Sequence, residues 1–495
     1  MKNERSSGIL LHITSLPGKY GIGTMGREAF DFVDFLVASG QKIWQILPLG
    51  HTGYGDSPYQ CFSAFAGNPL LIDLDKLVEQ ELLAKSDLPT DSFGDEAVDF
   101  GQVFQYKFAL LRKAYERFKA NNNEVRELQF ENFTKKNQFW LEDYAFFMAL
   151  KNHFQGKAWS EWDKPLKTRD ADTLERYRQH LADDIGFYRF LQFDFFRQWQ
   201  ELKAYANLND IKIIGDIPLY VAGDSADAWS NPGIFDFDKE LNPVTVAGVP
   251  PDYFSETGQL WGNPIYKWDV LQEQGFSWWI ERVKANLVLY DIIRIDHFRG
   301  LAAYWSVPFG EKTAIKGEWI EAPGQELLEA LYEALGELPI IAEDLGVITP
   351  DVVELRDGFD LPGMKILQFA FDSGEENDFM PHTFVKNCVV YTGTHDNDTT
   401  LGQFKSVRDS DRLLMKEYFG VDELDPAWSF IKLAWSSVAN IAIAPLQDVL
   451  RLDTEARMNF PGKASGYWKW RYRKETLKAE HARELLKITR LYGRR

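Results

Sequence analysis

The stretch Asp291–Gly300 joins a short apolar run to a charged cluster. The apolar run predicts a buried strand. Because side chains alternate along a strand, Arg294 and Asp296 share one face and lie side by side at the strand's end. Two interpretations fit this stretch alone: a structural ion pair, or a catalytic acid that the neighbouring guanidinium keeps ionised.

Three further strand-like runs also end in acidic residues. These are Asp216, Glu343 followed by Asp344, and Asp396 preceded by His395. In a parallel barrel, catalytic groups lie where the strands end, so these acids would converge on one mouth. Like charges disfavour each other's ionisation, and an arrangement of this kind costs stability. It is therefore typical of a site that performs chemistry or holds a metal.

Paired carboxylates without a metal favour chemistry at a glycosidic bond. One protonated acid donates to the leaving oxygen, and the other attacks the anomeric carbon or activates water. Asp296 beside Arg294 is expected to stay ionised, as a nucleophile requires. Glu343 follows the apolar residues 340–342, which would desolvate it and raise its pKa, as a general acid requires. Retention of configuration would place the two carboxyl groups about 5–5.5 Å apart.

The segment 248–266, expected as a loop, could form the wall of a sugar groove. Flat rings bind sugar faces, and amide groups bind sugar hydroxyls. A well-packed loop with aromatic anchors would explain the same composition. The residues concerned are Tyr253, Phe254, Trp261, Gln259 and Asn263.

Two other kinds of site have weaker support. The segments 236–238 and 395–398 contain ligand-type residues but match neither a Ca²⁺ loop nor a zinc His-Glu-x-x-His motif. Residues 21–26 fit G-x-G-x-x-G, but residues 15–18 separate them from the preceding strand, and no acid ends the second strand. We therefore expect no metal and no nucleotide cofactor, and a turn-forming role for these glycines.

The composition limits which binding partners and which cellular compartment we expect. The 495 residues carry a formal charge of −19, which argues against nucleic acid and anionic membranes as partners. Two cysteines, Cys61 and Cys388, cannot make a disulfide framework. With no signal core and no long apolar segment, we expect a cytoplasmic protein. The sequence leaves its oligomeric state open.

Eight strand-like runs, mostly separated by helical patterns, predict an α/β fold, a (β/α)8 TIM barrel with large, mostly helical insertions. An open doubly wound sheet is the alternative. The predicted strands cover residues 8–14, 42–49, 211–221, 292–298, 339–345, 364–369, 389–394 and 440–450.

A bare barrel takes roughly 250 residues, so the other residues are expected in insertions. Residues 1–495 together are expected to form a single catalytic unit. Helices are expected at 27–39, 190–205, 278–288, 326–335 and 477–492. The expected division is a barrel core at about 8–75 and 210–475, a mostly helical subdomain at 76–209, an active-site loop insertion at 222–270 and a C-terminal helix at 476–495.

Several long motifs, in order along nearly the whole chain, resemble one family. They are residues 53–60, 215–218, 250–254 with 258–259, 294–300, 342–346, 393–398, and 457–459 with 461–462. Together they resemble the 4-α-glucanotransferases called amylomaltases or disproportionating enzymes, glycoside hydrolase family 77. The resemblance implies a (β/α)8 barrel that transfers α-1,4-glucan segments between maltooligosaccharides or starch-derived glucans by a retaining double displacement. An α-glucan hydrolase and a non-catalytic glucan-binding protein are the alternatives.

The resemblance also implies roles for individual residues. Asp296 would be the nucleophile, Glu343 the acid and then the base, and Asp396 would stabilise the transition state. Tyr467 departs from the pattern, because an asparagine is expected before Trp468. The residues expected to contact sugar are Tyr59, Asp216, Arg294, His395, Trp261, Tyr253, Phe254, Gln259, Asn263, Ser57 and Tyr54.

Overall fold

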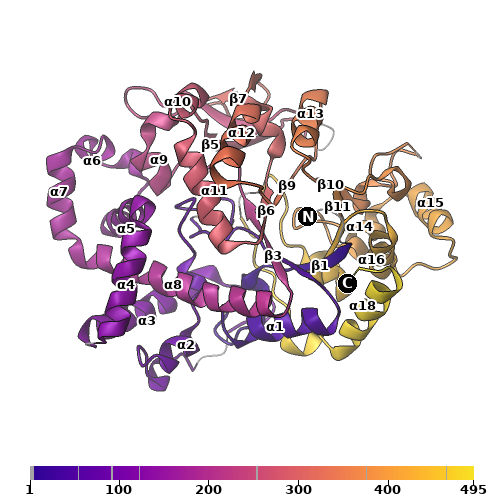
Figure 1. The fold of residues 1–495 in the computed structure, drawn as a ribbon, viewed down its shortest axis with the longest axis horizontal. Helices are drawn as coiled ribbons and strands as arrows, with labels where there is room; N and C mark the ends of the chain where they lie inside the picture. Colours follow the sequence, from indigo (N-terminus) through magenta and orange to yellow (C-terminus); the bar gives the residue numbers. More distant parts are fainter. Residues whose placement is uncertain are drawn as a thin grey trace.

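A parallel eight-stranded sheet lies at the centre of the computed structural model, which describes residues 5–53, 55–90, 93–121, 123–251, 255–374, 376–463 and 465–494 (Figure 1). The strand order is β10-β11-β12-β1-β2-β3-β6-β9, and each neighbouring pair is parallel. Every predicted strand is present, though each is shorter than expected. They are β1 (Ser6–Leu10), β2 (Ile43–Gln45), β3 (Lys212–Ile217), β6 (Ile292–Ile295), β9 (Ile340–Ala342), β10 (Gly363–Ile366), β11 (Cys388–Tyr391) and β12 (Ile441–Pro445).

The two ends of this sheet meet between β9 and β10. The Ala342 amide donates to the Pro362 carbonyl at 3.0 Å, and the Met364 amide donates to Asp344 Oδ1 at 2.7 Å. The other oxygen of Asp344 is paired with Arg356 at 2.6 Å. A side chain thus completes the closure where backbone pairing is sparse, and the sheet forms the predicted TIM barrel rather than an open doubly wound sheet.

Alternation along the strands separates two packed layers. One set of side chains fills the barrel interior, and the other set faces the surrounding helices. The charged residues at the carboxyl ends of β3 and β6 continue the interior set. Interior residues include Leu10, Ile43, Ile214, Ile292, Ile341, Ile366, Val389 and Ile443, and outward residues include Ile9, Trp44, Ile213, Ile293, Ile340, Val390 and Ala442.

Helices cover the outside of the barrel. The helices expected from the sequence are found, with ends that differ by at most two residues except at α8, which is longer. Around the barrel lie α1 (Arg27–Ala38), α11 (Ser277–Leu289), α12 (Gly324–Leu335), α13 (Pro350–Gly358), α14 (Thr400–Ser406), α15 (Asp409–Phe419), α16 (Pro426–Ser436), α17 (Leu446–Val449) and α18 (Ala479–Leu491).

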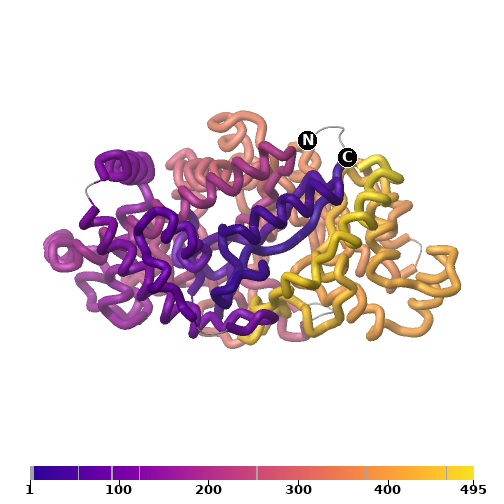
Figure 2. Tube along the Cα trace, turned by 90° about the horizontal axis from the view of Figure 1, so that it is seen from below, coloured from indigo at the N-terminus to yellow at the C-terminus, as the bar shows by residue number. Residues whose placement is uncertain are grey.

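A group of helices extends to one side of the barrel, shown in purple in Figures 1 and 2. The long helix α8 packs against α5 and leads directly into β3, so it connects this group to the barrel. The members are α2 (Leu74–Glu79), α3 (Phe100–Ala120), α4 (Glu124–Lys136), α5 (Gln138–His153), α6 (Lys164–Lys167), α7 (Ala171–His180) and α8 (Ala182–Leu208).

A second, antiparallel sheet was not anticipated. Its order is β5-β4-β7-β8, and it includes much of the segment expected as a loop. The prediction of a loop at 248–266 was therefore wrong in part, because two short strands interrupted by a bulge at Val246/Gly248 carry little period-two signal. The strands are β4 (Thr245–Val249), β5 (Gln259–Pro264), β7 (Ala303–Pro308) and β8 (Glu318–Glu321), and the short helices α9 (Ala226–Ser230) and α10 (Trp268–Glu273) lie nearby in the chain.

The two chain ends lie close together, and α18 packs against α1 (Figure 2). Arg494 is fully buried and donates to the carbonyls of Ser6 at 3.0 Å and Trp435 at 2.7 Å. Within the described residues, no helix is both long enough and apolar enough to cross a membrane.

Candidate active site

Arg294 joins two carboxylates at the carboxyl end of the barrel. Its Nη1 donates to Asp296 Oδ1 at 2.9 Å and to Asp216 Oδ2 at 2.6 Å. The register of β3 and β6 places Asp216 opposite Arg294, so both side chains point into the barrel mouth. The Asp216 side chain is fully buried, whereas the Asp296 side chain is 28% exposed. Asp296 is thus the member of this cluster that can meet a ligand.

A close packing contact lies directly beside this cluster. A Cβ on Gly215 would lie 2.1 Å from the ring of Tyr290, so only glycine fits at this strand position. The contact packs β3 closely against Tyr290, two residues before β6.

Burial raises the pKa of Asp296 to about 7. Arg294 lowers this pKa, and the nearby carboxylates of Asp216 and Asp396 raise it. Arg294 thus favours the ionised form of Asp296, as expected, while burial and the neighbouring carboxylates oppose it.

Glu343 follows β9 and lies beside the Asp296 strand. Its Oε2 accepts from the backbone amide of His297 at 2.7 Å, and its Oε1 accepts from that of Leu345 at 3.1 Å. Burial raises the pKa of Glu343 well above its usual value, as the apolar approach to this residue predicted. The two acids are thus held in different environments, the arrangement that separates a general acid from a nucleophile.

The His297 backbone makes this contact possible. His297 adopts a left-handed conformation with φ of 53°, directly after Asp296, and its amide donates to Glu343. Sequence reasoning missed His297, since it carries no signal beyond its place in the family motif.

Asp396 approaches the same mouth from the end of β11. Its Oδ1 accepts from Asn459 Nδ2 at 2.6 Å, and its carbonyl accepts from Arg457 at 2.7 Å. His395 Nε2 lies 3.4 Å from Asp396 Oδ2. The C-terminal segment therefore orients this acid, and only the family motif at residues 457–459 could have indicated these contacts from sequence.

Tyr59 forms an aromatic wall beside the acids. Its hydroxyl donates to Asp216 Oδ2 at 2.7 Å, and its ring stacks on His395 with centroids 5.2 Å apart. The Trp468 ring lies against both, at 5.8 Å and 5.9 Å. Ser57 Oγ accepts from the Tyr59 amide at 3.3 Å, so Ser57 positions Tyr59.

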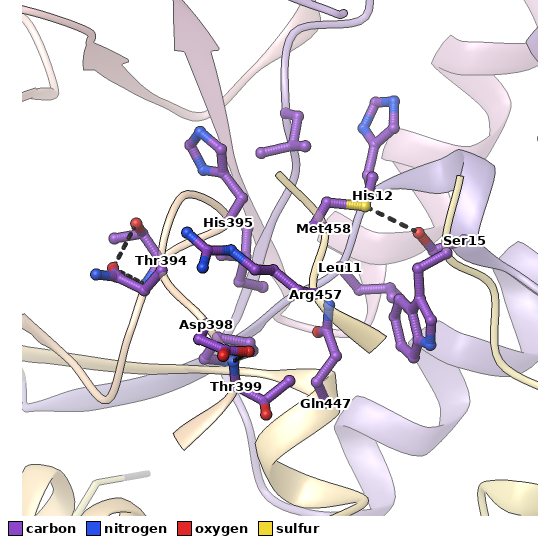
Figure 3. Close-up of a pocket in the computed structure, with 15 residues that line it drawn as sticks. Leu11, His12, Ser15, Thr394, His395, Asp398, Thr399, Gln447, Arg457 and Met458 are labelled. Atoms are coloured by element: carbon purple, nitrogen blue, oxygen red, sulfur yellow. Dashed lines mark hydrogen bonds between the residues drawn. The ribbon is translucent and has the colours of Figure 1, made fainter. Parts of the chain in front are cut away.

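Beneath His395 lies a water-sized cavity of about 20 Å³ (Figure 3). In this view the labelled side chains of Arg457, His12 and Met458 surround the space. Burial lowers the pKa of His12 to about 3, so this imidazole stays neutral. Asp398 accepts from the Thr399 amide at 2.8 Å and supports the turn that carries His395 and Asp396.

On the opposite side of the mouth, Trp261 packs edge-on against His297 at 4.7 Å. Its indole N–H donates to Gln259 Oε1 at 3.3 Å. Asn263 is buried, and its amide is held by the Val221 carbonyl at 2.8 Å and Gln60 at 3.3 Å. These two contacts fix the orientation of the Asn263 amide.

Of the other residues considered in the sequence, the structure describes Asp344 and Tyr467. Asp344 points to the β9–β10 seam and not to the mouth. Tyr467 packs its ring against Phe460 at 6.0 Å. The predictions for Tyr54, Tyr253 and Phe254 lie outside the described residues.

A TIM barrel whose mouth holds several carboxylates beside aromatic rings defines an enzyme class that transfers glycosyl groups by acid–base and covalent chemistry. Comparison with known proteins narrows this class. The chain matches the family model of 4-alpha-glucanotransferase, glycoside hydrolase family 77, over residues 11–477. The chain belongs to this family, which confirms the family predicted from its motifs.

Individual relatives are similar to this chain over nearly its whole length. The 4-alpha-glucanotransferase of Clostridium butyricum is 50% identical over 491 residues, covering 98% of this chain and all of the relative. That of Thermus thermophilus is 50% identical over 98% of both chains. The structure of an amylomaltase from Streptococcus agalactiae in complex with acarbose superposes with a TM-score of 0.97 at 43% identity, covering 99% of this chain and all of the other.

Proposed function

We propose that this protein transfers segments of α-1,4-glucans between maltooligosaccharides or starch-derived glucans by a retaining double displacement. The observation that carries the proposal is the pair Asp296 and Glu343 at one barrel mouth. Both carboxyl groups have a raised pKa, and only Asp296 contacts a guanidinium. Such a pair supplies one nucleophile and one proton donor.

In the first half-reaction, Glu343 donates its proton to the glycosidic oxygen while Asp296 attacks the anomeric carbon. The bond to the leaving glucan breaks, its oxygen keeps the proton, and the donor segment becomes an ester of Asp296. Asp396, oriented by Asn459, lies beside the sugar and stabilises the positive charge that develops on its ring.

In the second half-reaction, Glu343 accepts the proton of an acceptor hydroxyl. The hydroxyl oxygen attacks the anomeric carbon, the ester breaks, and Asp296 leaves as a carboxylate. Arg294 is in place to receive that charge. A glucan hydroxyl in place of water makes the reaction a transfer. The rings of Tyr59 and Trp468 on one side of the mouth, and of Trp261 on the other, favour a sugar at this position.

Incubation with maltotriose tests the activity. We expect glucose and a ladder of longer oligosaccharides, with a constant number of reducing ends, because each bond broken is replaced by a bond formed. Chromatography of the products and a reducing-end assay measure both. A rise in reducing ends without longer products would identify a hydrolase instead.

The substitution Asp296→Asn tests the catalytic role and the non-catalytic alternative together. Turnover should fall by at least about a thousandfold, because an amide cannot form the ester, while maltooligosaccharide binding persists. Activity and calorimetric binding are measured on the same preparation. Retained turnover would contradict the mechanism. A wild-type protein that binds glucan without turnover would instead be a glucan-binding protein.

We further propose a cytoplasmic location and the division into barrel, helical subdomain at 76–209 and active-site insertion at 222–270. The location is supported by the free thiols of Cys61 and Cys388, which are typical of a reducing compartment. Fractionation of cells that express the protein tests it.

A further inference from the structure

A second cavity lies outside the barrel mouth, lined by residues of α5, α9 and α11. Figure 1 labels these three helices. Its volume is about 240 Å³, and none of the residues assigned to the mechanism lines it. This is ample room for several water molecules, and enough for one sugar ring. The cavity therefore suits a ligand of the size of a single hexose unit.

Aromatic rings form one side of this cavity. Phe65 packs edge-on against Phe139 at 5.4 Å and against Trp278 at 6.0 Å, and stacks with Trp140 at 6.4 Å. Phe139 remains 50% exposed although it belongs to this cluster. An uncovered ring beside a cavity is the kind of surface on which the apolar face of a sugar packs.

Hydrogen-bonding groups form the other side. Asp227 is 4% exposed, and its Oδ2 accepts from the Ala64 amide at 2.8 Å. Asn231 lines the cavity and donates its amide to Ser230 Oγ at 2.9 Å, and a side-chain amide oxygen can accept from a hydroxyl donor. Carboxylate, amide and hydroxyl oxygens together match the hydroxyl groups of a sugar.

The charges around the cavity favour a neutral ligand. No lysine or arginine is among the described residues that line it, so an anion would meet carboxylates alone. Two of these carboxylates already have cationic partners: Asp143 pairs with Arg169 at 2.8 Å, and Glu281 with Lys284 at 3.1 Å. At these two carboxylates a cationic ligand would compete with existing ion pairs, whereas a neutral polyol would not. The third carboxylate, Asp227, is only 4% exposed.

We propose that this cavity is a non-catalytic binding site for one neutral hexose unit. The unit is either a free monosaccharide or the end of a glucan chain. The choice between these sources rests on the proposed function, because only a protein that works on glucans would meet chain ends at high local concentration. In the second case the site anchors a glucan while the barrel mouth acts elsewhere on the polymer.

The site also shares a segment of chain with the mouth. Tyr59, which donates to the buried acid Asp216, is six residues from Phe65, and the Ala64 amide between them donates to Asp227 in the cavity. Ligand binding at the cavity therefore contacts the segment that positions Tyr59.

Binding to the Asp296→Asn variant tests the proposal without turnover. Methyl α-glucoside and a long amylose are titrated separately into this variant, alone and combined with Phe139→Ala. We expect Phe139→Ala to weaken the binding of at least one of these ligands about fivefold or more. Loss for the glucoside identifies a monosaccharide site, and loss for amylose alone identifies a chain-end anchor.

Phe104→Ala is the matched control, because Phe104 lies on α3, is also 50% exposed and does not line the cavity. It should leave both titrations unchanged. Equal binding in the Phe139→Ala and Phe104→Ala proteins would overturn the proposal, as would preferred binding of a small cation such as tetramethylammonium. Disproportionation of maltotriose is also measured for the single variant Phe139→Ala, which keeps Asp296. A failure of the proposed function is thereby distinguished from a failure of the proposed binding site.

Discussion

Arg294 contacts two carboxylates, and burial, this guanidinium and the neighbouring acids together set the pKa of Asp296. One nitrogen, Nη1, contacts both Asp216 and Asp296. Burial raises the pKa of Asp296 to about 7, and Asp216 contributes to the increase. The acid limb of the pH–activity profile should therefore report the ionisation of Asp296, because activity is lost as the pH falls through the pKa of the nucleophile.

The substitution Asp216→Asn should move this limb to lower pH. Removing a neighbouring negative charge favours the ionised form of Asp296, so its pKa falls and activity persists in more acidic solution, by about one pH unit. The measurement is kcat/KM against pH for both proteins. Loss of the contact with Tyr59 will lower the maximal rate, but only the position of the limb tests this account. An unmoved limb, or one that moves to higher pH, would contradict it.

Asn459 is a positioning residue for Asp396. Asn459→Ala removes the 2.6 Å hydrogen bond to Oδ1 and leaves the half-exposed carboxylate free to turn. We expect kcat to fall about 10–100-fold with a smaller change in KM, since misplacement affects the transition state more than substrate binding. Asn387→Ala, which removes contacts to Asp360 far from the mouth, is the control. A change in KM alone would assign Asn459 to substrate binding.

Sequence reasoning found the acids of the site but not what positions them. Asp216, Asp296, Glu343 and Asp396 stand out because each ends a strand-like run. Asn459 and the backbone amide of His297 act through contacts with residues 63 and 46 positions away, and no local pattern encodes such distances. The buried state of Asn263 was equally invisible, since its neighbours come from other segments.

At the scale of elements, the barrel strands were predictable and the second sheet was not. A parallel strand buried on both faces forms a nearly continuous apolar run, and all eight such runs were found. Strands β4, β5, β7 and β8 are short and mixed in polarity, so they resemble loops until they pair. Strand lengths were overestimated because an apolar run continues beyond the last backbone pairing.

The closure between β9 and β10 depends on a side chain. Asp344→Asn should lower the free energy of unfolding by about 2–4 kcal/mol, because it leaves the half-buried Arg356 without its closest charge partner. Urea denaturation measures the difference. Asp357→Asn is a matched control, because Asp357 also pairs with Arg356 but is 59% exposed, and its loss should cost at most about 0.5 kcal/mol. Equal effects of the two substitutions would refute a special role for the closure.

At the scale of the whole molecule, the chain ends are joined through one buried side chain. Arg494 donates to the carbonyls of Ser6, Trp435 and Ser437. It therefore connects the last described residue to β1 and to the segment that precedes the last strand, β12. Figure 2 shows both termini at this one edge. The first and last barrel segments are thus held together although they are far apart in sequence.

Arg494→Met should therefore lower the melting midpoint by several degrees, because several carbonyls lose a charged donor in a buried place. Differential scanning calorimetry of the full chain measures this. Arg490→Met, on the exposed face of α18, should leave the midpoint within one or two degrees. If both variants melt together with the wild type, the chain ends contribute nothing to stability.

The shared guanidinium also bears on the energy balance of the proposed reaction cycle. When Asp296 becomes an ester it loses its charge. Arg294 then pairs with Asp216 alone, and this ion pair has no net charge. The reactant enzyme and the ester enzyme thus both hold a stable partner for the cation. Neither the free enzyme nor the ester leaves the Arg294 charge without a partner. The ester can therefore form and break over barriers of similar height. Reversibility of this kind is what an exchange of equivalent bonds demands, since donor and product store the same energy.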